Sequence, residues 1–170
     1  KEVMHYEVST IKKIHLDNIA EMREVIESGQ KSGVECGLEL VDELTSGWQK
    51  TDLIILAGRP SMGKTATAIT MVIEPSINKG IPVAIFSCEM SNAQLGGRIQ
   101  ANLSGIDVGR IIKKQLDLSD VAYLEKANEK LLTAPLYIDD TPNISLTELK
   151  SKARRLHREK GIKLIVIDYL

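Results

Sequence analysis

The spacing of apolar residues predicts one isolated helix near the start of the chain. Between residues 9 and 28, isoleucine, methionine and valine recur at helical intervals, and Gly29 offers a C-terminal stop. The helix would carry one apolar stripe on an otherwise charged surface. That stripe must pack either on the body that follows or on another copy of the chain. Residues 30–37 have the composition of a linker or loop.

Farther along the chain, apolar runs and amphipathic stretches alternate. A short helix is expected at 38–44. Strands are expected at 52–57, 82–87, 136–139 and 163–168, and helices at 64–74, from 91 onward, at 118–132 and at 145–160. Pro75 ends or kinks the helix at 64–74, and Ser91 and Ser145 open capping boxes. Apolar strands separated by helices predict an α/β fold with a mostly parallel sheet covered on both faces.

A glycine-rich loop follows the first of these strands. Residues 58–65, GRPSMGKT, match the phosphate-binding pattern G-x-x-x-x-G-K-[ST] in full, between an expected strand and an expected helix. That context makes a chance glycine turn the much weaker interpretation. Backbone N–H groups and the helix N-terminus would hold phosphate, with Lys64 on the β- and γ-phosphates and the Thr65 hydroxyl on Mg²⁺. The expected nucleotide-binding residues are Gly58, Arg59, Pro60, Ser61, Met62, Gly63, Lys64, Thr65 and Ala66.

Two carboxylates follow later strands and would complete a hydrolytic site. Asp168 ends the apolar run LIVID, a Walker B pattern, and would provide a second anchor for Mg²⁺. Glu89 follows the strand at 82–87 by two residues, where a carboxylate can orient water for attack on the γ-phosphate. An aspartate that merely ends a strand and a solvated glutamate are the alternatives. We expect Glu89 and Lys64 to be catalytic, Thr65 and Asp168 to bind the metal, and ATP and Mg²⁺ to be the cofactors.

The motifs AGRPSMGKT, FSCEMS and LIVIDYL, in that order, resemble the motor domain of DnaB-like replicative helicases, which are RecA-like ATPases. The segment GLELVDELTSGW at 37–48 is similar to the one that precedes the first strand of that family. The resemblance covers 33–170, and residues 1–32 correspond to a linker helix region. The chain starts without methionine and stops after an apolar run, so we expect a piece of a longer protein, with an ATPase domain incomplete at its C-terminus.

The resemblance implies a RecA-like P-loop core and a function. ATP hydrolysis would drive 5′–3′ translocation on single-stranded DNA and duplex unwinding in a ring of six identical subunits, although the residues themselves carry no information on polarity. It also implies a cytoplasmic protein of a bacterium or phage-infected cell, no membrane association, and primase and a helicase loader as candidate partners. The DNA-contacting loops and the arginine finger would lie beyond Leu170, so this chain would bind nucleotide more readily than it hydrolyses it.

Two rival classes stay open. One is a RecA-like recombinase or clock-type ATPase, and the other is a nucleotide-binding module whose only output is oligomerisation. The 22 basic and 23 acidic residues nearly cancel, so net charge does not discriminate. One segment, residues 150–163, is strongly basic: its only acidic residue is Glu159, and its basic residues are Lys150, Lys152, Arg154, Arg155, Arg158, Lys160 and Lys163. This segment would either contact DNA phosphates or a partner subunit, or form a solvated helix face. The solvated helix face is the favoured interpretation.

The remaining polar residues give weaker signals. Asp139 and Asp140 end the strand at 136–139, and would either face the nucleotide crevice or simply form the turn after the strand. Cys36 and Cys88 have no cysteine or histidine nearby at metal-ligand spacing, so a zinc site is not expected. No apolar run approaches the roughly 20 residues that span a bilayer.

Overall fold

The computed structural model describes residues 8–29, 31–59 and 61–168, and the chain divides into two compact units, Lys1–Ser32 and Gly33–Leu170. In the described part of the first unit lies the helix α1 (Ile11–Ser28), which confirms the predicted helix to within two residues. The Thr10 hydroxyl caps its start by accepting from the Lys13 N–H at 3.3 Å, and Gly29 ends it with φ 63°, a left-handed angle that glycine adopts without strain. No residue of α1 is buried.

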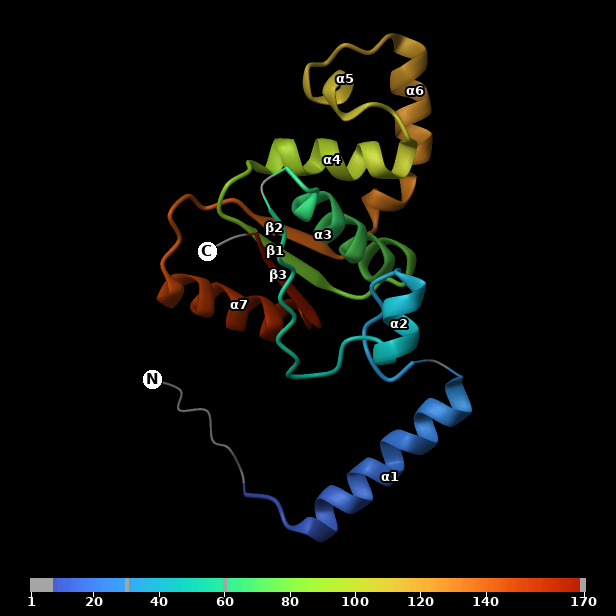
Figure 1. The fold of residues 1–170 in the computed structure, drawn as a ribbon, viewed down its shortest axis with the longest axis vertical. Helices are drawn as coiled ribbons and strands as arrows, with labels where there is room; N and C mark the ends of the chain where they lie inside the picture. The colour runs from blue at the N-terminus through green and yellow to red at the C-terminus, as the bar shows by residue number, and fades with distance from the viewer. Residues whose placement is uncertain (1–7, 30, 60, 169–170) are drawn as a thin grey trace. The chain divides into compact units, whose positions relative to one another are not determined.

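The second unit is built on a three-stranded parallel sheet with the order β2-β1-β3 (Figure 1). The strands are β1 (Val83–Ser87), β2 (Leu136–Asp139) and β3 (Leu164–Asp168), which confirms three of the predicted strands. In the register, Ser87 pairs with Asp168 and Phe86 with Asp139. The carboxyl ends of all three strands therefore meet at one edge of the sheet, where parallel α/β sheets bind ligands.

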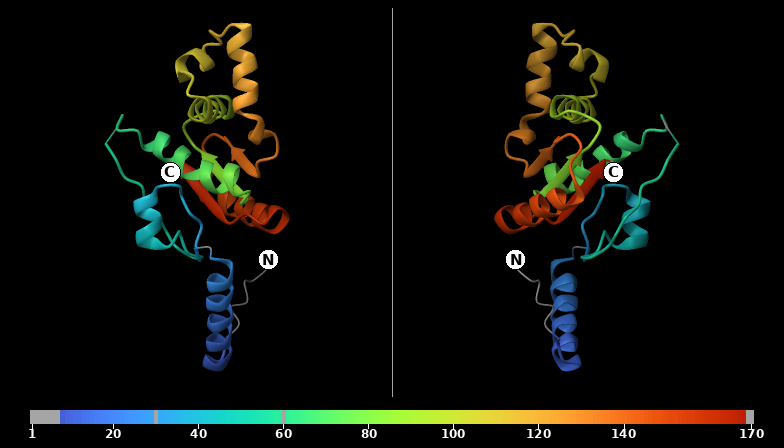
Figure 2. Two further views of the ribbon diagram at one scale, coloured as in Figure 1. Left: turned by 90° about the vertical axis from the view of Figure 1, so that its right-hand side faces the viewer. Right: turned by 90° about the vertical axis from the view of Figure 1, so that its left-hand side faces the viewer.

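Helices cover both faces of the sheet, in agreement with the predicted α/β fold. On one face lie α3 (Lys64–Ile73), the π-helix η1 (Glu74–Asn78) and α4 (Asn92–Ser104). The other face is covered by α7 (Leu146–Lys160) (Figures 1 and 2). Successive strand residues alternate between the faces, so Val83 and Ile85 pack under α3 and α4 whereas Ala84 and Phe86 pack on the α7 side.

The predicted strand at 52–57 is wrong. Residues 53–59 form neither helix nor strand, and Leu53 and Ile55 are 86% and 79% exposed. In the described part of the chain β3, like β2, is an edge strand of the sheet. Its Ile165 and Ile167 are 39% and 38% exposed, so burial on both faces does not extend to β3. A strand exists only where a neighbour accepts its ladder of hydrogen bonds, and an apolar run does not by itself provide that neighbour.

The helices on the first face follow their predicted signals closely. Pro75 lies at the start of η1, so the helix begun at Lys64 changes to π geometry there instead of continuing straight. Ser91 and Gln94 form the complete predicted capping box of α4. Gly97 is buried in α4, and a Cβ at this position would lie 3.2 Å from Cγ1 of Ile112. This glycine therefore allows the next helix to approach α4 closely.

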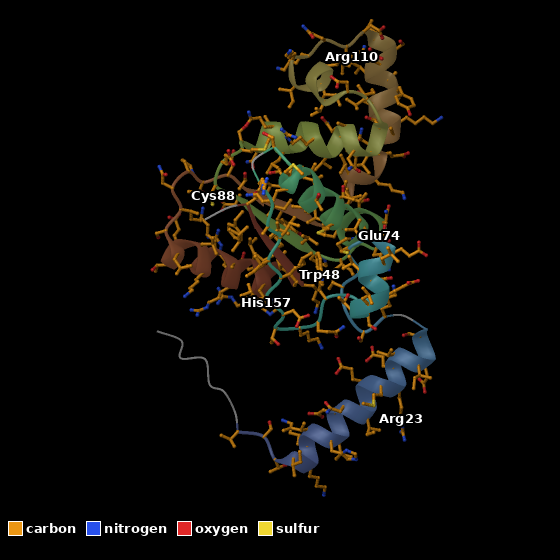
Figure 3. All side chains as sticks on the ribbon, viewed as in Figure 1. Arg23, Trp48, Glu74, Cys88, Arg110 and His157 are labelled. Carbon is orange, nitrogen blue, oxygen red and sulfur yellow. The ribbon has the colours of Figure 1, made fainter. Side chains whose placement is uncertain are left out.

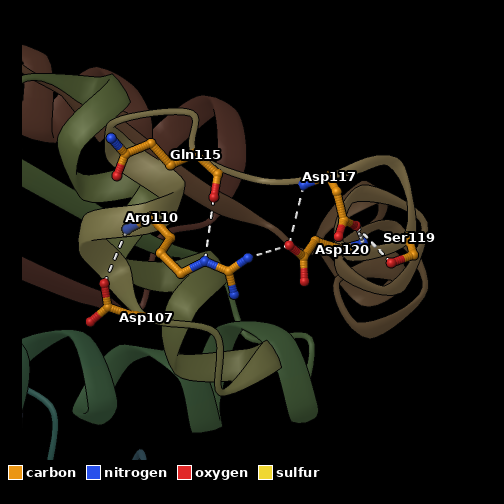
Figure 4. A network of polar contacts seen from close by, with 6 residues as sticks. All are labelled: Asp107, Arg110, Gln115, Asp117, Ser119 and Asp120. Atoms are coloured by element: carbon orange, nitrogen blue, oxygen red, sulfur yellow. Dashed lines mark hydrogen bonds and ion pairs between the residues drawn. The ribbon is translucent and has the colours of Figure 1, made fainter.

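That next helix, α5 (Val108–Ile112), was not predicted, because five residues are too few to show helical periodicity. The predicted helix at 118–132 is divided into α6 (Leu118–Ala127) and a 3₁₀ turn, η2 (Glu129–Leu132). Both α5 and α6 pack on α4, on the side away from the sheet (Figure 2). The Arg110 guanidinium joins them, donating to the Asp120 carboxylate and to the Gln115 carbonyl (Figure 4).

The segment before the glycine loop also contains a helix, α2 (Glu39–Thr45), close to its predicted place. Its buried Asp42 accepts hydrogen bonds from the N–H groups of Cys36 and Gly37, at 2.8 and 2.9 Å. Burial raises the pKa of the Cys36 thiol, and Cys36 and Cys88 are both free thiols. Across the described residues, no helix is long and apolar enough to cross a bilayer.

Candidate nucleotide-binding site

Three residues predicted from two separate motifs meet at the carboxyl edge of the sheet. The Thr65 hydroxyl donates to Oδ2 of Asp168 at 2.7 Å, although 103 positions separate them in the chain. The Nζ atom of Lys64 lies 3.7 Å from Oδ1 of the same carboxylate. Asp168 is the last residue of β3 and its side chain is only 8% exposed, whereas Lys64 is the first residue of α3 and is 31% exposed. The sheet edge thus faces the N-terminus of α3.

The glycine loop, which leads into Lys64 and Thr65, is open to solvent. Ser61, Met62, Gly63 and Ala66 are exposed, as are Gly58 and Arg59, whereas Pro60 lies outside the described residues. Gly63 has φ 84° and Ser61 has φ 65°, so the chain turns sharply into α3. No side chain in the described residues caps α3. The first N–H groups of a helix have no partner within the helix, and anions bind at such an end.

Glu89 follows the end of β1, the strand next to β3, at the same edge of the sheet. It is exposed in the turn that joins β1 to α4, and it directly follows Cys88, which Figure 3 labels. The Cys88 N–H donates to the Asp168 carbonyl at 2.8 Å, which places the two predicted carboxylates on adjacent strand ends. The catalytic role of Glu89 stays a prediction.

The oxygen atoms of Thr65 and Asp168 are suited to Mg²⁺, which prefers hard oxygen ligands and is usually held by one or two carboxylates together with substrate phosphates. Within the described residues, no group of three or more His, Cys, Asp and Glu side chains could hold a metal without other ligands. A pocket lined by Thr65, Ala68, Ile69, Ile85, Leu95, Val166 and Asp168 adjoins the Thr65–Asp168 contact. Its enclosed part has room for about one water molecule, so a nucleotide would lie over the exposed loop instead.

Asp139 and Asp140 have different partners at the end of β2. Oδ2 of Asp139 lies 2.8 Å from Nζ of Lys152 on α7, and Oδ2 of Asp140 accepts from the N–H of Asn92 at 2.8 Å. Burial opposes ionisation of Asp139, but hydrogen bonds from Lys152 and Thr141 outweigh it and lower the pKa of Asp139. The hydrogen bond to Asp139 raises the pKa of Lys152. The sequence alone could not assign these partners, because they lie on distant segments.

Replacing Asp139 with asparagine is expected to lower the midpoint of thermal unfolding at pH 7 by a few degrees, because the ion pair with Lys152 is lost. Since the folded-state pKa of Asp139 is lowered, the stability that it contributes is present above its unfolded pKa of about 4 and is lost as the pH falls through the folded value. Unfolding followed by circular dichroism should show the two proteins converge at acid pH. A Glu159→Gln control, at an exposed site, should unfold at the wild-type temperature at every pH. If the unfolding midpoint of Asp139→Asn differed from that of the wild type by the same amount at every pH, the ion pair between Asp139 and Lys152 would be contradicted as the cause.

The basic segment lies on α7 and just beyond it. Lys150, Arg154, Arg155, Arg158, Lys160 and Lys163 are exposed. Lys152 is the exception, because it is partly buried and pairs with Asp139 and, at 3.5 Å, with Glu148. The Nζ atom of Lys160 lies 5.8 Å from the centre of the Tyr137 ring. This arrangement agrees with a solvated helix face on which Lys152 has a structural role.

Comparison with known proteins identifies the family. Residues 33–170 match the DnaB-like helicase C terminal domain. The chain is 42% identical over 157 residues to the replicative DNA helicase DnaB of Nostoc sp., covering 91% of this chain and 18% of that protein. A solved structure described as an ATPase domain has a TM-score of 0.85 and 26% identity, over 96% of this chain and 58% of that one.

A second solved structure, a DnaB-like replicative helicase described with its interactions with primase, has a TM-score of 0.73 over 96% of this chain and 39% of that one. At 24% identity it shows the shared fold alone. The chain spans less than a fifth of the length of the Nostoc helicase. The predicted RecA-like α/β fold and the predicted family are confirmed, and the chain belongs to the family of DnaB-like helicase C-terminal domains.

Proposed function

We propose that this chain is part of a helicase motor that binds and hydrolyses ATP to unwind duplex DNA. The observation that carries the proposal is the junction of Lys64, Thr65 and Asp168, which joins the phosphate loop to the end of β3. Family membership favours a helicase over the rival recombinase and clock-type ATPase. An oligomerisation module would not need a metal-binding carboxylate beside the phosphate loop.

The residues have distinct tasks in this proposal. When bound, Mg²⁺ neutralises charge that develops on the β- and γ-phosphates. The N–H groups at the start of α3 hold phosphate oxygens, and the Lys64 ammonium, which is partly exposed, donates to them. The Thr65 hydroxyl and the Asp168 carboxylate supply oxygen ligands. Glu89 accepts a hydrogen bond from the attacking water and orients it.

Two measurements test the proposal. A fluorescent ATP analogue titrated into this chain should bind with an affinity that falls when Mg²⁺ is removed; absence of binding would contradict the nucleotide site. A forked-duplex assay on the full-length protein should then show strand displacement that requires ATP hydrolysis. Hydrolysis without displacement would favour the recombinase or clock class, and binding without hydrolysis would favour the oligomerisation module.

The assembly and its partners belong to the same proposal. We place the protein in the cytoplasm as a ring of six identical subunits around single-stranded DNA, translocating 5′–3′, with primase and a loader as partners. A solved relative of the same fold is described with its interactions with primase, which supports that partner. In this proposal α1, in the unit before Gly33, is the linker helix.

Replacing the apolar stripe of α1 is expected to weaken ring assembly. Ile14, Met22 and Ile26 are 42%, 58% and 79% exposed, and a stripe of this kind is stable in water only when another surface covers it. Serine at these three positions should shift the full-length protein from hexamers toward smaller species in sedimentation velocity. A Glu24→Gln control on the polar face should sediment as the wild type does. An unchanged ring would indicate that the stripe packs within its own subunit.

A further inference from the structure

Glu89 lies in a short turn, residues 88–91, between β1 and α4. Because Glu89 is exposed, the two ends of this turn determine where its carboxylate lies. At the β1 end, the Ser87 hydroxyl donates to the Met90 carbonyl at 2.7 Å and accepts from the Met90 N–H at 3.1 Å. The bond from Cys88 to the Asp168 carbonyl ties the same end to β3.

The α4 end of the turn has an anchor from a distant segment. Asn92 is the first residue of α4, and its N–H donates to Oδ2 of Asp140 at 2.8 Å, across 48 positions of sequence. The N–H groups in the first turn of a helix have no partner within the helix, and negative charge is favourable there. The Glu89 turn is therefore held between the end of β3 on one side and the residue after β2 on the other.

Asp140 is itself held in place by its neighbours. Asp139, directly before it, accepts from the Thr141 N–H at 3.0 Å and pairs with Lys152 at 2.8 Å. Lys152 also donates to the Thr141 hydroxyl at 2.6 Å. These contacts fix the backbone on both sides of Asp140, so its carboxylate reaches Asn92 from a rigid base.

We infer that Asp140 is a positioning residue for Glu89 and thereby sets the rate of ATP hydrolysis. The inference rests on the role of Glu89 in the proposed function. Without the Asp140 acceptor, the Ser91–Gln94 capping box would still hold the start of α4, but the tie between the α4 end of the turn and the residue after β2 would be lost, and the Glu89 carboxylate would sample more positions. A general base must stay within hydrogen-bond reach of its water. Asp140 does not belong to the Lys64–Thr65–Asp168 junction. Loss of the Asp140 carboxylate should therefore lower kcat and leave the KM for ATP unchanged.

The test removes each half of the bond in the full-length protein. Asp140→Ala should lower kcat about tenfold or more, with the KM and Kd for ATP changed less than about twofold. Asp140→Asn, which retains an acceptor oxygen, should recover most of the rate. Asn92→Pro removes the donor at a helix position that accepts proline, after an extended Ser91, and should lower kcat in the same way. Asn92→Ala keeps the N–H and should behave as the wild type does.

Asp117→Ala is the matched control, because Asp117 caps α6 by accepting from the Asp120 N–H at 2.8 Å. It should change stability without changing kcat. The inference is overturned if Asp140→Ala and Asn92→Pro lower kcat no more than this control, or if they raise KM instead. Glu89→Gln distinguishes failure of the proposed catalytic role of Glu89 from failure of the positioning role of Asp140. Normal ATP turnover by Glu89→Gln would contradict the role of Glu89. Slow turnover by Glu89→Gln together with normal turnover by Asp140→Ala would contradict the positioning role alone. In the Glu89→Gln protein, Asp140→Ala should cause no further loss.

Discussion

Replacing Lys64 with alanine is expected to lower the affinity for ATP by about 10–100-fold and to reduce turnover at least as much, since a charge-assisted hydrogen bond contributes about 1.5–3 kcal/mol. Lys64 is the first residue of α3, and its ammonium lies beside the Asp168 carboxylate at the sheet edge. In a phosphate loop of this pattern, the lysine is the residue that reaches the terminal phosphates. Titration of a fluorescent ATP analogue and a phosphate-release assay would measure both effects.

The control for this variant is Lys150→Ala, an exposed lysine on α7 that should leave nucleotide affinity unchanged. The Lys64 variant should also keep the wild-type far-ultraviolet spectrum, because its side chain is not part of the apolar core. Normal ATP binding by a folded Lys64→Ala protein would remove the phosphate-loop assignment, and the proposed function with it.

Glu89→Gln is expected to retain ATP binding and to lose about 10²–10⁴-fold in the rate of hydrolysis, the usual contribution of a general base. Glutamine has the shape of glutamate but cannot accept a proton at neutral pH. Glu89 is exposed and lies one residue beyond Cys88, whose N–H is bound to the Asp168 carbonyl. Single-turnover kinetics in the full-length protein would separate binding from chemistry.

A useful comparison is Glu159→Gln, another exposed glutamate, but on α7. It should turn over ATP at the wild-type rate. If Glu89→Gln hydrolyses ATP normally, the base must be another residue, whereas the roles of Lys64 and Thr65 would stand. Weak ATP binding by Glu89→Gln would instead indicate that Glu89 contributes to affinity.

The sequence predicted the elements that depend on local signals. The helix α1 was predicted from its apolar spacing and its Gly29 stop, α4 was predicted from its Ser91 capping box, and Pro75 correctly marked a change in helix geometry. The family was recognised from three short motifs. Such features succeed because their physical causes lie within a few residues of one another.

Features that depend on distant partners were not predicted. Residues 53–59 have the composition of a strand, yet they form no ladder, because composition does not supply a neighbour. The bond from Asn92 to Asp140 links segments that carry no shared motif. The sequence placed Asp168 at a strand end, but only the fold shows that Thr65 donates to it.

Asp168 takes part in two sets of contacts through different atoms. Its carboxylate binds the Thr65 hydroxyl and faces Lys64, whereas its backbone carbonyl accepts from the Cys88 N–H. A ligand that displaces the carboxylate would therefore also act on the N–H of Cys88, the residue before Glu89. We therefore expect ligand binding at the Asp168 carboxylate to be coupled to the position of the Glu89 carboxylate. Movement of either one should displace the other.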